Sequence, residues 1–403
     1  MTDPITARVR EALGAEAVGQ DTNGRPRVAP ESSEDLARVM GLAHAEGWKV
    51  RIEGRATWCA VDVPADLVIS TSALDCVVNV APQDLVTTVE AGATFGTIQH
   101  RLAEDRVWLA CDPPGRAQRS IGSVLATGTA GPLRHRFGPV RDLLLGVTFV
   151  TGDGRVIRPG GTVVKNVAGY DLGKLVAGSF GAFGIITELH LRLRAIPEVD
   201  RTLLARGSRD SLTLAGRDLS AAAIDAVALE LFSPAMGADP EWVLAVRLMG
   251  EIEGVEAEAA RTAATAALPW TTLAPEQANA LWHGASHAAH AGSVTLRLGV
   301  LVDGLDDTLD LLADHLDIGL VSAGAGSGSI RWTGEATVER LMTFRRAAAG
   351  REIPVTLERG PWSVRQGFGH FGLYREGVSA LVGRLRDSFD PGHVLLVPLD
   401  AAP

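Results

Sequence analysis

The clearest pattern of apolar and polar positions lies in the middle of the chain, in the stretch that starts at Ile185. Apolar and polar side chains alternate there over several residues. The apolar positions are Leu189, Leu191 and Leu193, and the polar positions are His190, Arg192 and Arg194. A repeat of two residues is the period of a β-strand with one buried face. We therefore predict a half-buried strand here, preceded directly by a glycine-rich segment.

Hydrophobic periodicity and turn residues predict further elements on both sides of this strand. Helices are predicted from the Ser32-Ser33 cap to about Gly47, from Thr94 to about Glu104, and over Ala257–Ala267, Leu305–Leu316 and Val378–Phe389. Strands are predicted over Trp48–Ile52, Leu67–Ser70, Val77–Val80, Leu85–Glu90, Leu143–Val150, Arg155–Ile157, Trp242–Leu248, Val294–Val300 and Ser329–Trp332. The turn Gly152-Asp153-Gly154 joins two of these strands into a predicted hairpin. This mixture predicts an α+β protein.

Length and composition limit the possible classes. At 403 residues the chain exceeds the roughly 250–300 residues at which single cores stop growing, so two lobes are expected. The chain is 46% hydrophobic and 21% charged, which is typical of a globular protein. A net charge of −10 argues against nucleic-acid or anionic-membrane partners. No basic start precedes an apolar core, and no apolar run reaches the roughly 18 residues of a membrane span, so the expected location is the cytoplasm.

Cysteine and histidine spacing gives little sign of a metal site. The three cysteines are Cys59, Cys76 and Cys111, an odd number without a close pair, which predicts free thiols and no zinc or iron–sulfur ligand set. The residues His283, His287 and His290 share one face of a predicted helix. That spacing can bind a metal, but no carboxylate or cysteine lies among them. An ordinary polar helix face is the preferred interpretation, and we expect no metal.

The segment Lys165–Leu193, which precedes and includes the half-buried strand, is rich in glycine. Its glycines are Gly169, Gly173, Gly178, Gly181 and Gly184. Glycine is used where the backbone needs a positive φ or where a Cβ would block another group. Two interpretations of these glycines stay open. Either they make a tight turn with a short helix packed close, or they let the backbone lie flat against a bulky ligand.

The whole segment resembles part of a known flavin fold. The phrases Lys165-Asn166-Val167-Ala168-Gly169-Tyr170-Asp171 and Gly178-Ser179-x-Gly181-x-x-Gly184-Ile185-Ile186 are similar to the flavin-contacting segment of the vanillyl-alcohol-oxidase-type, or PCMH-type, FAD-binding fold. Within that fold the chain most resembles the FAD-binding E subunits of bacterial glycolate oxidases. The resemblance implies a PCMH-type FAD-binding domain of two α/β subdomains in residues 1–197, an α+β cap domain in residues 198–360, and a C-terminal segment, 361–403, that returns to the FAD domain.

The resemblance also implies which residues hold FAD. They are Gly54, Arg55, Ala56, Thr57, Trp58, Pro114, Gly115, Ser120, Ile121, Gly122, Ala126, Thr127, Gly128, Gly131, Gly181, Gly184, Ile185 and Ile186. The loops around Gly54 and Gly181 are expected to converge on one cofactor. Relatives carry glycines where Arg55 and Ala56 stand, so Arg55 either adds a charge near the phosphates or flavin affinity is weakened. The relatives' sites of covalent attachment lack histidine and cysteine here, so dissociable FAD is expected.

Substrate and catalytic residues are less well defined. Arg134 belongs to the basic cluster Leu133-Arg134-His135-Arg136, which is either a solvated face or a carboxylate site. Arg297 and Arg331 lie on predicted cap strands that resemble strands of the E subunits, which implies substrate contacts. The proton of a substrate hydroxyl needs an acceptor near the flavin. Candidates by chemistry are Tyr170, His135 and His283, and the sequence places none of them there.

The resemblance implies an FAD-dependent oxidoreductase. The first hypothesis is the FAD-binding subunit of a glycolate-oxidase-like complex, which oxidises a short 2-hydroxy acid to the 2-oxo acid. A second flavoprotein and an iron–sulfur subunit would be its partners. A free-standing FAD-dependent oxidase or dehydrogenase of an alcohol, sugar or hydroxy acid is the second hypothesis. A noncatalytic scaffold that has lost the cofactor is the third.

Overall fold

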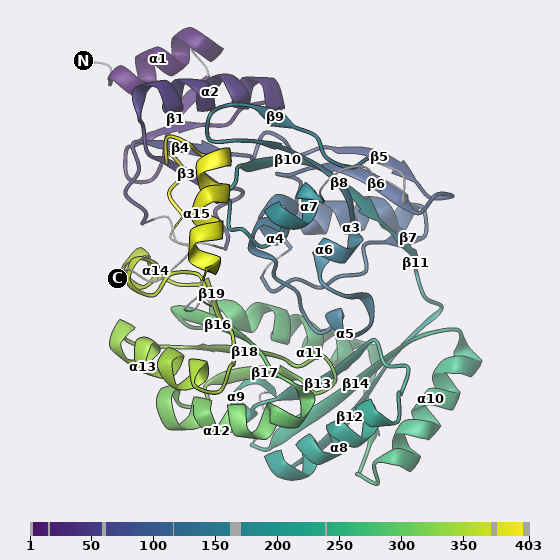
Figure 1. The fold of residues 1–403 in the computed structure, drawn as a ribbon. Coiled ribbons are helices and arrows are strands. Elements are labelled where there is room, and N and C mark those ends of the chain that lie inside the picture. Colours follow the sequence, from purple (N-terminus) through teal and green to yellow (C-terminus); the bar gives the residue numbers. More distant parts are fainter. Residues whose placement is uncertain are drawn as a thin grey trace.

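The structure is divided between an N-terminal half with two small sheets and a C-terminal half built on one large sheet (Figure 1). It is a computed structural model that describes residues 3–14, 17–58, 62–115, 117–161, 171–237, 240–371 and 377–397. The predicted α+β class is confirmed by the mixture of helices and sheets. The two lobes expected from the chain length correspond to these halves.

A four-stranded sheet forms the outer part of the N-terminal half. Its strand order is β1 (Val18–Gln20), β2 (Pro26–Val28), β4 (Leu67–Ser70) and β3 (Val50–Glu53), with β4 parallel to both β2 and β3. The helices α1 (Pro4–Leu13) and α2 (Ser33–Glu46) cover it. Helix α2 begins as predicted, because the Ser32 side chain accepts a hydrogen bond from the amide of Asp35, and it ends at Gly47 with φ of 72°.

A five-stranded antiparallel sheet forms the rest of this half. Its order is β5 (Val77–Ala81), β6 (Val86–Glu90), β10 (Ile185–Arg192), β8 (Leu144–Val150) and β9 (Val156–Ile157). The predicted half-buried strand is its centre, with Leu189 and Leu191 fully buried and Arg192 exposed. The helices α3 (Phe95–Glu104), α4 (Ile121–Thr127), α6 (Val140–Leu143) and α7 (Leu172–Val176) pack against this sheet. The predicted hairpin is confirmed, because β8 and β9 pair antiparallel.

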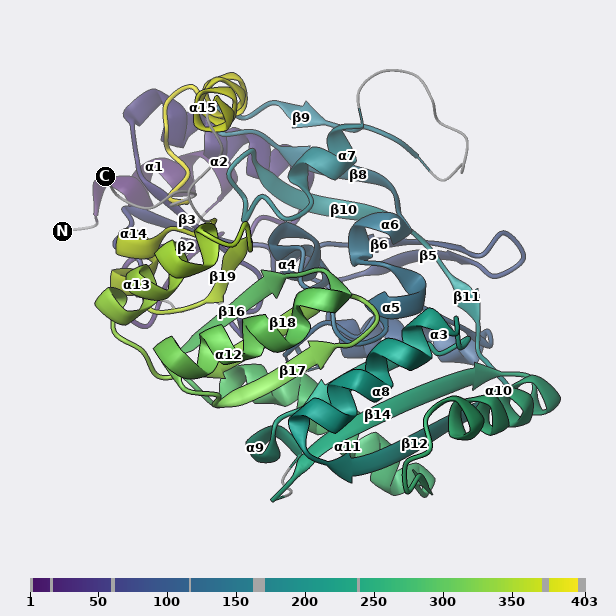
Figure 2. The same ribbon diagram turned by 60° about the horizontal axis from the view of Figure 1, so that its bottom comes forward.

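The C-terminal half is built on an eight-stranded sheet. Its order is β15 (Thr271–Thr272), β12 (Val199–Gly207), β14 (Trp242–Gly250), β13 (Ala228–Phe232), β17 (Leu320–Gly324), β18 (Ser329–Gly334), β16 (Val294–Gly299) and β19 (Val355–Arg359). One face is covered by α8 (Arg209–Ala221), α10 (Ile252–Thr265), α12 (Leu305–Leu316) and α13 (Val338–Ala349) (Figure 2). Helices α9 (Pro234–Gly237) and α11 (Pro275–His287) lie on the other face, whose remaining area turns toward the N-terminal half.

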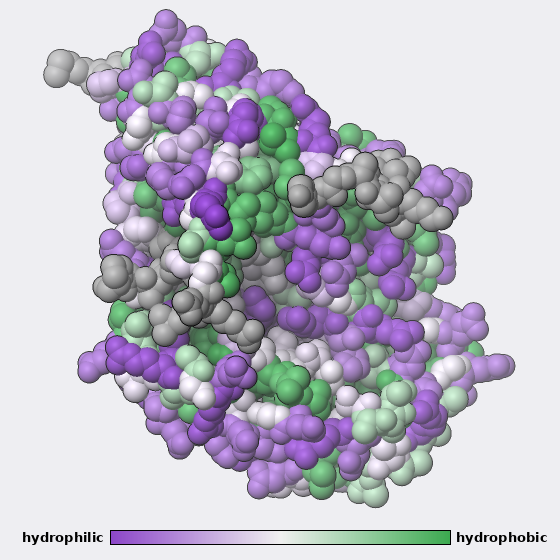
Figure 3. Space-filling view, viewed as in Figure 1, coloured by the Kyte–Doolittle hydropathy of each residue, from purple (hydrophilic) through white to green (hydrophobic). Residues whose placement is uncertain are grey.

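The chain crosses between the halves more than once. A two-stranded ribbon of β7 (Val107–Trp108) and β11 (Arg194–Ala195) lies where the chain leaves the N-terminal half. After α14 (Trp362–Phe368), helix α15 (Val378–Phe389) lies back beside the N-terminal half, and Leu395 bridges to Val50 of β3 (Figure 1). An apolar strip of surface runs beside α15 in an otherwise largely hydrophilic view (Figure 3). The domain limits at residues 197 and 360 stay a prediction.

Most predicted elements are found within a few residues of their expected limits. Strand β4 and helices α12 and α15 have the predicted bounds, but α10 begins five residues earlier than predicted, at Ile252. Apart from the buried Val255, the residues of its first turn are exposed, so a single apolar position does not mark the start of the helix. Five strands of the large sheet, β12, β13, β15, β17 and β19, were not predicted. Among the described residues, no helix is long and apolar enough to cross a membrane.

Candidate functional site

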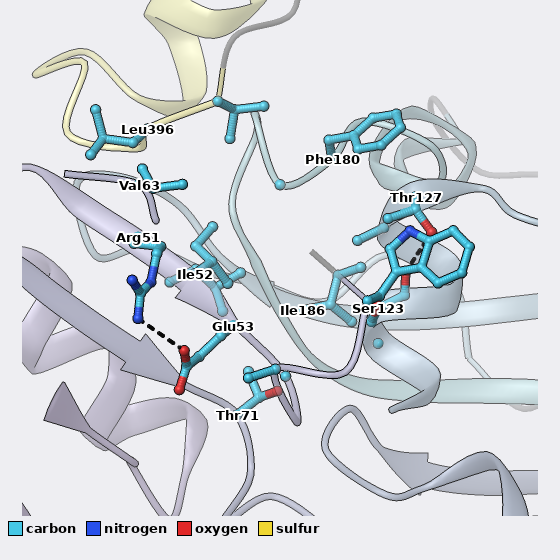
Figure 4. Close-up of a pocket in the computed structure, with 18 of the residues that line it drawn as sticks. Arg51, Ile52, Glu53, Val63, Thr71, Ser123, Thr127, Phe180, Ile186 and Leu396 are labelled. Carbon is cyan, nitrogen blue, oxygen red and sulfur yellow. Dashed lines mark hydrogen bonds and ion pairs between the residues drawn. The ribbon is translucent and has the colours of Figure 1, made fainter. Parts of the chain in front are cut away.

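Two walls face each other across a cleft in the N-terminal half (Figure 4). One wall is β3 with the loop Gly54–Trp58, and the other is α4 with residues from the segment Phe180–Ile186. The cleft encloses about 1040 Å³, including open solvent at its mouth. The loops around Gly54 and Gly181, which were expected to converge, therefore line the same cleft.

The cleft contains most of the residues for which the sequence predicts cofactor contact. Those that line it are Gly54, Arg55, Ala56, Thr57, Trp58, Gly122, Ala126, Thr127, Gly181, Gly184, Ile185 and Ile186. The predicted residues Pro114, Gly115, Ser120, Ile121, Gly128 and Gly131 do not line it. The lining residues that the prediction omitted are Arg51, Ile52, Glu53, Val63, Thr71, Ser123, Phe180, Arg365, His370, Leu396 and Val397.

The loop after β3 shows how the chain manages without two of the family's glycines. Ala56 adopts a positive φ of 53°, which costs free energy for a residue with a Cβ. Arg55 donates to the carbonyl oxygen of Gly92 at 3.0 Å and forms an ion pair with Asp75 at 2.8 Å. Its guanidinium group is thus anchored on the neighbouring sheet rather than left to attract phosphates.

Several glycines allow close backbone packing, and some of them line the cleft. Gly128 and Gly178 pack backbone against backbone, since a Cβ on Gly128 would lie 3.0 Å from the Cα of Gly178. Gly54 lets its loop touch α4, since its Cβ would lie 2.1 Å from the Oγ of Ser120. Gly181, with φ of 88°, lines the cleft itself. Close packing of the walls and access to the cleft therefore both depend on glycine.

Glu53, an acidic residue of the cleft lining on β3, takes part in a network of ion pairs that neutralises its charge. Glu53 accepts from Arg27 at 2.7 Å and from Arg51 at 3.2 Å, and Arg51 also contacts Asp21 at 3.1 Å. Figure 4 shows the contact between Arg51 and Glu53 at the edge of the cleft. Because the carboxylate is paired with two arginines, it does not repel an anion that enters the cleft.

An aromatic pair forms another part of the lining. The ring of His370 stacks on Phe180, with centroids 3.8 Å apart and planes 17° from parallel. Phe180 has φ of 56°, an unusual value for a bulky residue. His370 Nδ1 lies 2.9 Å from the carbonyl oxygen of Leu357, which can only accept, so Nδ1 carries the proton and Nε2 carries a lone pair. Burial lowers the pKa of His370 to about 4, which keeps the ring neutral.

The lining fits FAD by its chemistry. Apolar side chains can cover flat rings, and hydroxyl groups and a turn of backbone amides can hold phosphates. The apolar members are Ile52, Val63, Phe180, Ile185, Ile186 and Leu396, and the hydroxyl members are Thr57, Thr71, Ser123 and Thr127. The buried Oγ of Ser120, directly behind Gly54, has no hydrogen-bond partner among the described residues. A cofactor with rings and phosphates therefore suits this cleft.

Beyond the cleft, the three arginines predicted for substrate binding come together around one carboxylate. Glu358 is fully buried and accepts from Arg297 Nε at 3.0 Å and from Arg331 Nε at 2.9 Å. Arg331 also donates to the carbonyl oxygen of Ala130 at 2.7 Å. Arg134 lies close enough that burial and the charges of Arg297 and Arg331 lower its pKa. We call Arg134, Arg297, Arg331 and Glu358 the arginine cluster.

Strand register explains why the cap residues of this cluster meet. Arg331 on β18 pairs with Arg297 on β16 and with Ser322 on β17, so the three side chains point to the same face. Glu358 lies two residues beyond Thr356, which pairs with Arg297. That face is the one not covered by α8, α10, α12 and α13. The sheet thus presents a row of polar groups to the N-terminal half.

Two further acidic groups lie beside this row. Burial raises the pKa of Asp112 to about 7 and that of Glu230 to about 8, although Arg331 acts against both shifts. Asp112 accepts from the amide of Leu133, and Glu230 accepts from the Ser322 hydroxyl at 2.8 Å. By contrast, although burial favours its protonated form, the ion pairs with Arg331 and Arg297 hold the pKa of Glu358 below its ordinary value.

These raised pKa values predict that stability falls as pH rises. The folded protein keeps protons on Asp112 and Glu230 at pH values where the unfolded chain has lost them. The stabilisation is complete below about pH 4 and is lost as pH rises through 7 to 8. We expect Tm to decrease between pH 5 and 9. The free energy of unfolding should fall by at most about 1.4 kcal/mol per pH unit for each group. Thermal unfolding of Glu230→Gln should show a flatter slope, and an unchanged slope would contradict the assignment.

The basic cluster that contains Arg134 divides between different environments in α5 (Arg134–Phe137). Arg134 donates to Ser329 Oγ at 3.2 Å, whereas Arg136 is exposed and pairs with Asp225. His135 packs on the backbone of Gly326, and its buried Nδ1 has no partner among the described residues. The carboxylate-site interpretation therefore suits Arg134 and the solvated-face interpretation suits Arg136.

The candidate proton acceptors are placed as follows. His135 and His283 do not line the cleft, and His283 is exposed on α11 beside His287. Tyr170 and the phrase Lys165–Tyr170 lie outside the described residues. His290 faces Trp58 instead of sharing a site with the other two histidines. Within the described chain, no group of three or more potential ligands is arranged to hold a metal ion.

Comparison with known proteins agrees with this geometry. Residues 26–160 match the family described as FAD binding domain. Over 128 residues the chain is 40% identical to glycolate oxidase subunit GlcE of Escherichia coli strain K12. The matched segment covers 32% of this chain and only 37% of that protein. Over 409 residues it is 24% identical to glycolate oxidase subunit GlcD of Bacillus subtilis strain 168. This match covers 91% of this chain and 87% of that protein.

A solved structure shows the same arrangement over nearly the whole chain. The chain superposes on 4-ethylphenol oxidase from Gulosibacter chungangensis with a TM-score of 0.76, over 97% of this chain and 95% of that one. The sequence identity is 13%, so this likeness concerns the fold. Residues 26–160 are therefore similar to an FAD-binding domain, and the chain as a whole shares its α+β fold with that oxidase.

Proposed function

We propose that this chain binds FAD without a covalent bond and serves as the FAD-binding subunit of a glycolate-oxidase-like complex. The complex oxidises a short 2-hydroxy acid to the 2-oxo acid, and the electrons pass to partner subunits, a second flavoprotein and an iron–sulfur protein. The observation that carries this proposal is the arginine cluster placed directly beyond one end of the cofactor cleft. The similarity to two glycolate oxidase subunits supports the substrate class.

The arginine cluster supplies the charge that a hydroxy acid needs. Arg134, Arg297 and Arg331 carry three positive charges, and Glu358 offsets one of them. Arg134 and Arg297 are only partly buried, so an incoming carboxylate can reach them. Guanidinium groups bind carboxylates through paired hydrogen bonds. The remaining positive charge therefore favours a small carboxylate at this face.

The other residues of the site hold and shield the reacting groups. FAD, when bound, accepts the electrons that leave the substrate. The Gly54–Trp58 loop and α4 would hold its phosphates, and Phe180 and Ile186 would cover its rings. His370 offers a neutral Nε2 that can accept a hydrogen bond from a group bound in the cleft. Trp58 lines the cleft and donates a hydrogen bond to the backbone of Glu358 in the arginine cluster.

A free-standing hydroxy-acid dehydrogenase is the second candidate function. The similarity to the GlcD subunit extends over 91% of this chain, whereas the similarity to the GlcE subunit is confined to about a third of it. A chain of this kind would carry its own substrate chemistry and need only an electron acceptor. Such an enzyme would use the same cleft and the same arginine cluster as the subunit of the first proposal. The two candidate functions therefore differ in whether turnover depends on partner subunits.

Cofactor release and turnover test these proposals. The purified full-length protein is expected to be yellow, and heating should release FAD that is identified by its absorbance and chromatographic mobility. Turnover of glycolate or D-lactate with a dye acceptor is measured with and without the candidate partner subunits. Turnover only with partners supports the subunit role, and full turnover alone supports the free-standing enzyme. A colourless protein that stays colourless after FAD is added would identify a noncatalytic scaffold.

A further inference from the structure

Trp58 extends from the cofactor loop into the other half of the molecule. Its indole Nε1 donates to the backbone carbonyl oxygen of Glu358 at 3.0 Å, and both residues are buried, with 3% and 0% of their surface exposed. The guanidinium group of Arg119 lies over the indole ring at 3.9 Å, and the ring of His290 meets its edge at 5.4 Å. The indole is therefore held on several sides.

Glu358 joins this contact to the arginine cluster. Its backbone oxygen holds Trp58, and its side chain holds Arg297 and Arg331. A shift of the Glu358 backbone moves the carboxylate that sets the positions of both guanidinium groups. One residue therefore lies between the loop that lines the cofactor cleft and the arginines proposed for the substrate.

A second attachment lies close to the first along the chain. Asp62 accepts from the amide of Trp362 at 2.6 Å and from Arg365 at 3.0 Å. Arg365 itself lines the cofactor cleft. The chain that follows the cofactor loop is thus fixed to α14 as well as to β19. The position of the loop and the position of the cap strand are not independent.

We propose that Trp58 is a positioning residue that couples the cofactor cleft to the arginine cluster through Glu358. This inference rests on the proposed function, since it assumes that the cleft holds FAD and that the cluster holds a carboxylate. FAD in the cleft fixes the Gly54–Trp58 loop, the indole then fixes Glu358, and Arg297 and Arg331 are held ready for an anion. Bound FAD thereby strengthens the binding of the anion. By thermodynamic linkage, the anion must strengthen the binding of FAD by the same factor.

The test measures the coupling between two ligands and needs no turnover. FAD affinity of the full-length protein is determined by fluorescence titration with and without saturating oxalate, a small carboxylate that cannot be oxidised at a C–H bond. We expect oxalate to tighten FAD binding about tenfold in the unaltered protein, within the usual range of coupling. Trp58→Phe keeps an aromatic ring but removes the N–H donor, and its coupling should fall below about threefold.

A matched control is available on α11. The indole of Trp282 is also buried and donates to Thr202 Oγ1 at 3.0 Å, away from the cleft. Trp282→Phe removes a hydrogen bond of the same kind and should retain the full coupling. Full coupling in Trp58→Phe, or an equal loss in Trp282→Phe, would overturn the inference while leaving the proposed function intact. Absence of FAD binding in the unaltered protein would overturn both.

A second measurement keeps the inference testable if Trp58→Phe fails to fold. Hydrogen exchange of the β19 amides, Val355–Arg359, is followed in the unaltered protein before and after FAD is added. Exchange should slow several-fold in β19, because fixing Trp58 restrains Glu358. Strand β12, on the far side of the sheet, should change less. No slowing of exchange in β19, or slowing equal to that in β12, would contradict the coupling.

Discussion

Replacement of Gly54 by valine should raise the Kd for FAD by at least about 100-fold and yield a colourless protein. The Cβ of any residue at this position would lie 2.1 Å from Ser120 Oγ and 3.1 Å from Ser120 Cβ, with Ser123 Cβ at 3.8 Å. Rotation of the Ser120 hydroxyl cannot accommodate valine, so the loop must move away from α4. A 100-fold loss corresponds to about 2.7 kcal/mol of binding free energy. FAD content after purification and fluorescence titration measure the effect.

A control and a partial rescue show whether this contact is the cause. Gly41 lies in α2, where a Cβ would meet nothing within 4 Å, so Gly41→Ala should bind FAD normally. In Gly54→Ala, the smaller side chain still clashes with the Ser120 hydroxyl. The double variant Gly54→Ala with Ser120→Ala removes that oxygen and should recover most of the affinity. Normal FAD binding by Gly54→Val would contradict the placement of the cofactor in this cleft.

Arg331→Met should destabilise the protein by about 3–5 kcal/mol and also weaken its affinity for small carboxylates. Glu358 is fully buried, and without Arg331 its carboxylate keeps only Arg297 as an ionic partner. Removal of one member of a buried ion pair leaves a charge without adequate solvation, which is the costly case. Urea unfolding gives the change in stability, and calorimetry with oxalate gives the change in affinity.

Companion variants separate the two effects. Arg340 pairs with Asp317 at the surface, where 44% and 81% of the side chains are exposed, so Arg340→Met should cost less than about 1 kcal/mol. Adding Glu358→Gln to Arg331→Met removes the unpaired charge and should restore much of the stability. It should not restore oxalate affinity in full, because one of the three guanidinium groups is still missing. Recovery of both properties would show that Arg331 has a structural role only.

Local signals in the sequence were sufficient for much of the secondary structure. The alternation after Ile185 identified the central strand of a sheet, and the Ser32 cap and Gly47 gave both ends of α2. These features depend on residues within a few positions of one another, which is why they can be read from the sequence. The unpredicted strands of the C-terminal half were missed although glycine or proline flanks several of them, because their limits depend on pairing with distant strands.

The candidate site was predicted only in part. The loops around Gly54 and Gly181 were identified because their spacing resembles a known fold. His370 and Arg365 were missed, because nothing in their neighbourhood marks them and they reach the cleft from the C-terminal part of the chain. Arg55 was given two possible roles, and only its contact with Asp75 shows that its charge is already paired.

The sequence by itself determined many of the elements, the α+β class and the two glycine loops, because short-range periodicity, capping and turn chemistry depend on neighbouring residues. Only the tertiary structure decided that Arg297 and Arg331 share Glu358 and that Trp58 reaches the same residue from the other half. The physical reason is burial. A charge or an indole N–H removed from water needs a partner, and the packing of distant strands and loops selects which residue provides it.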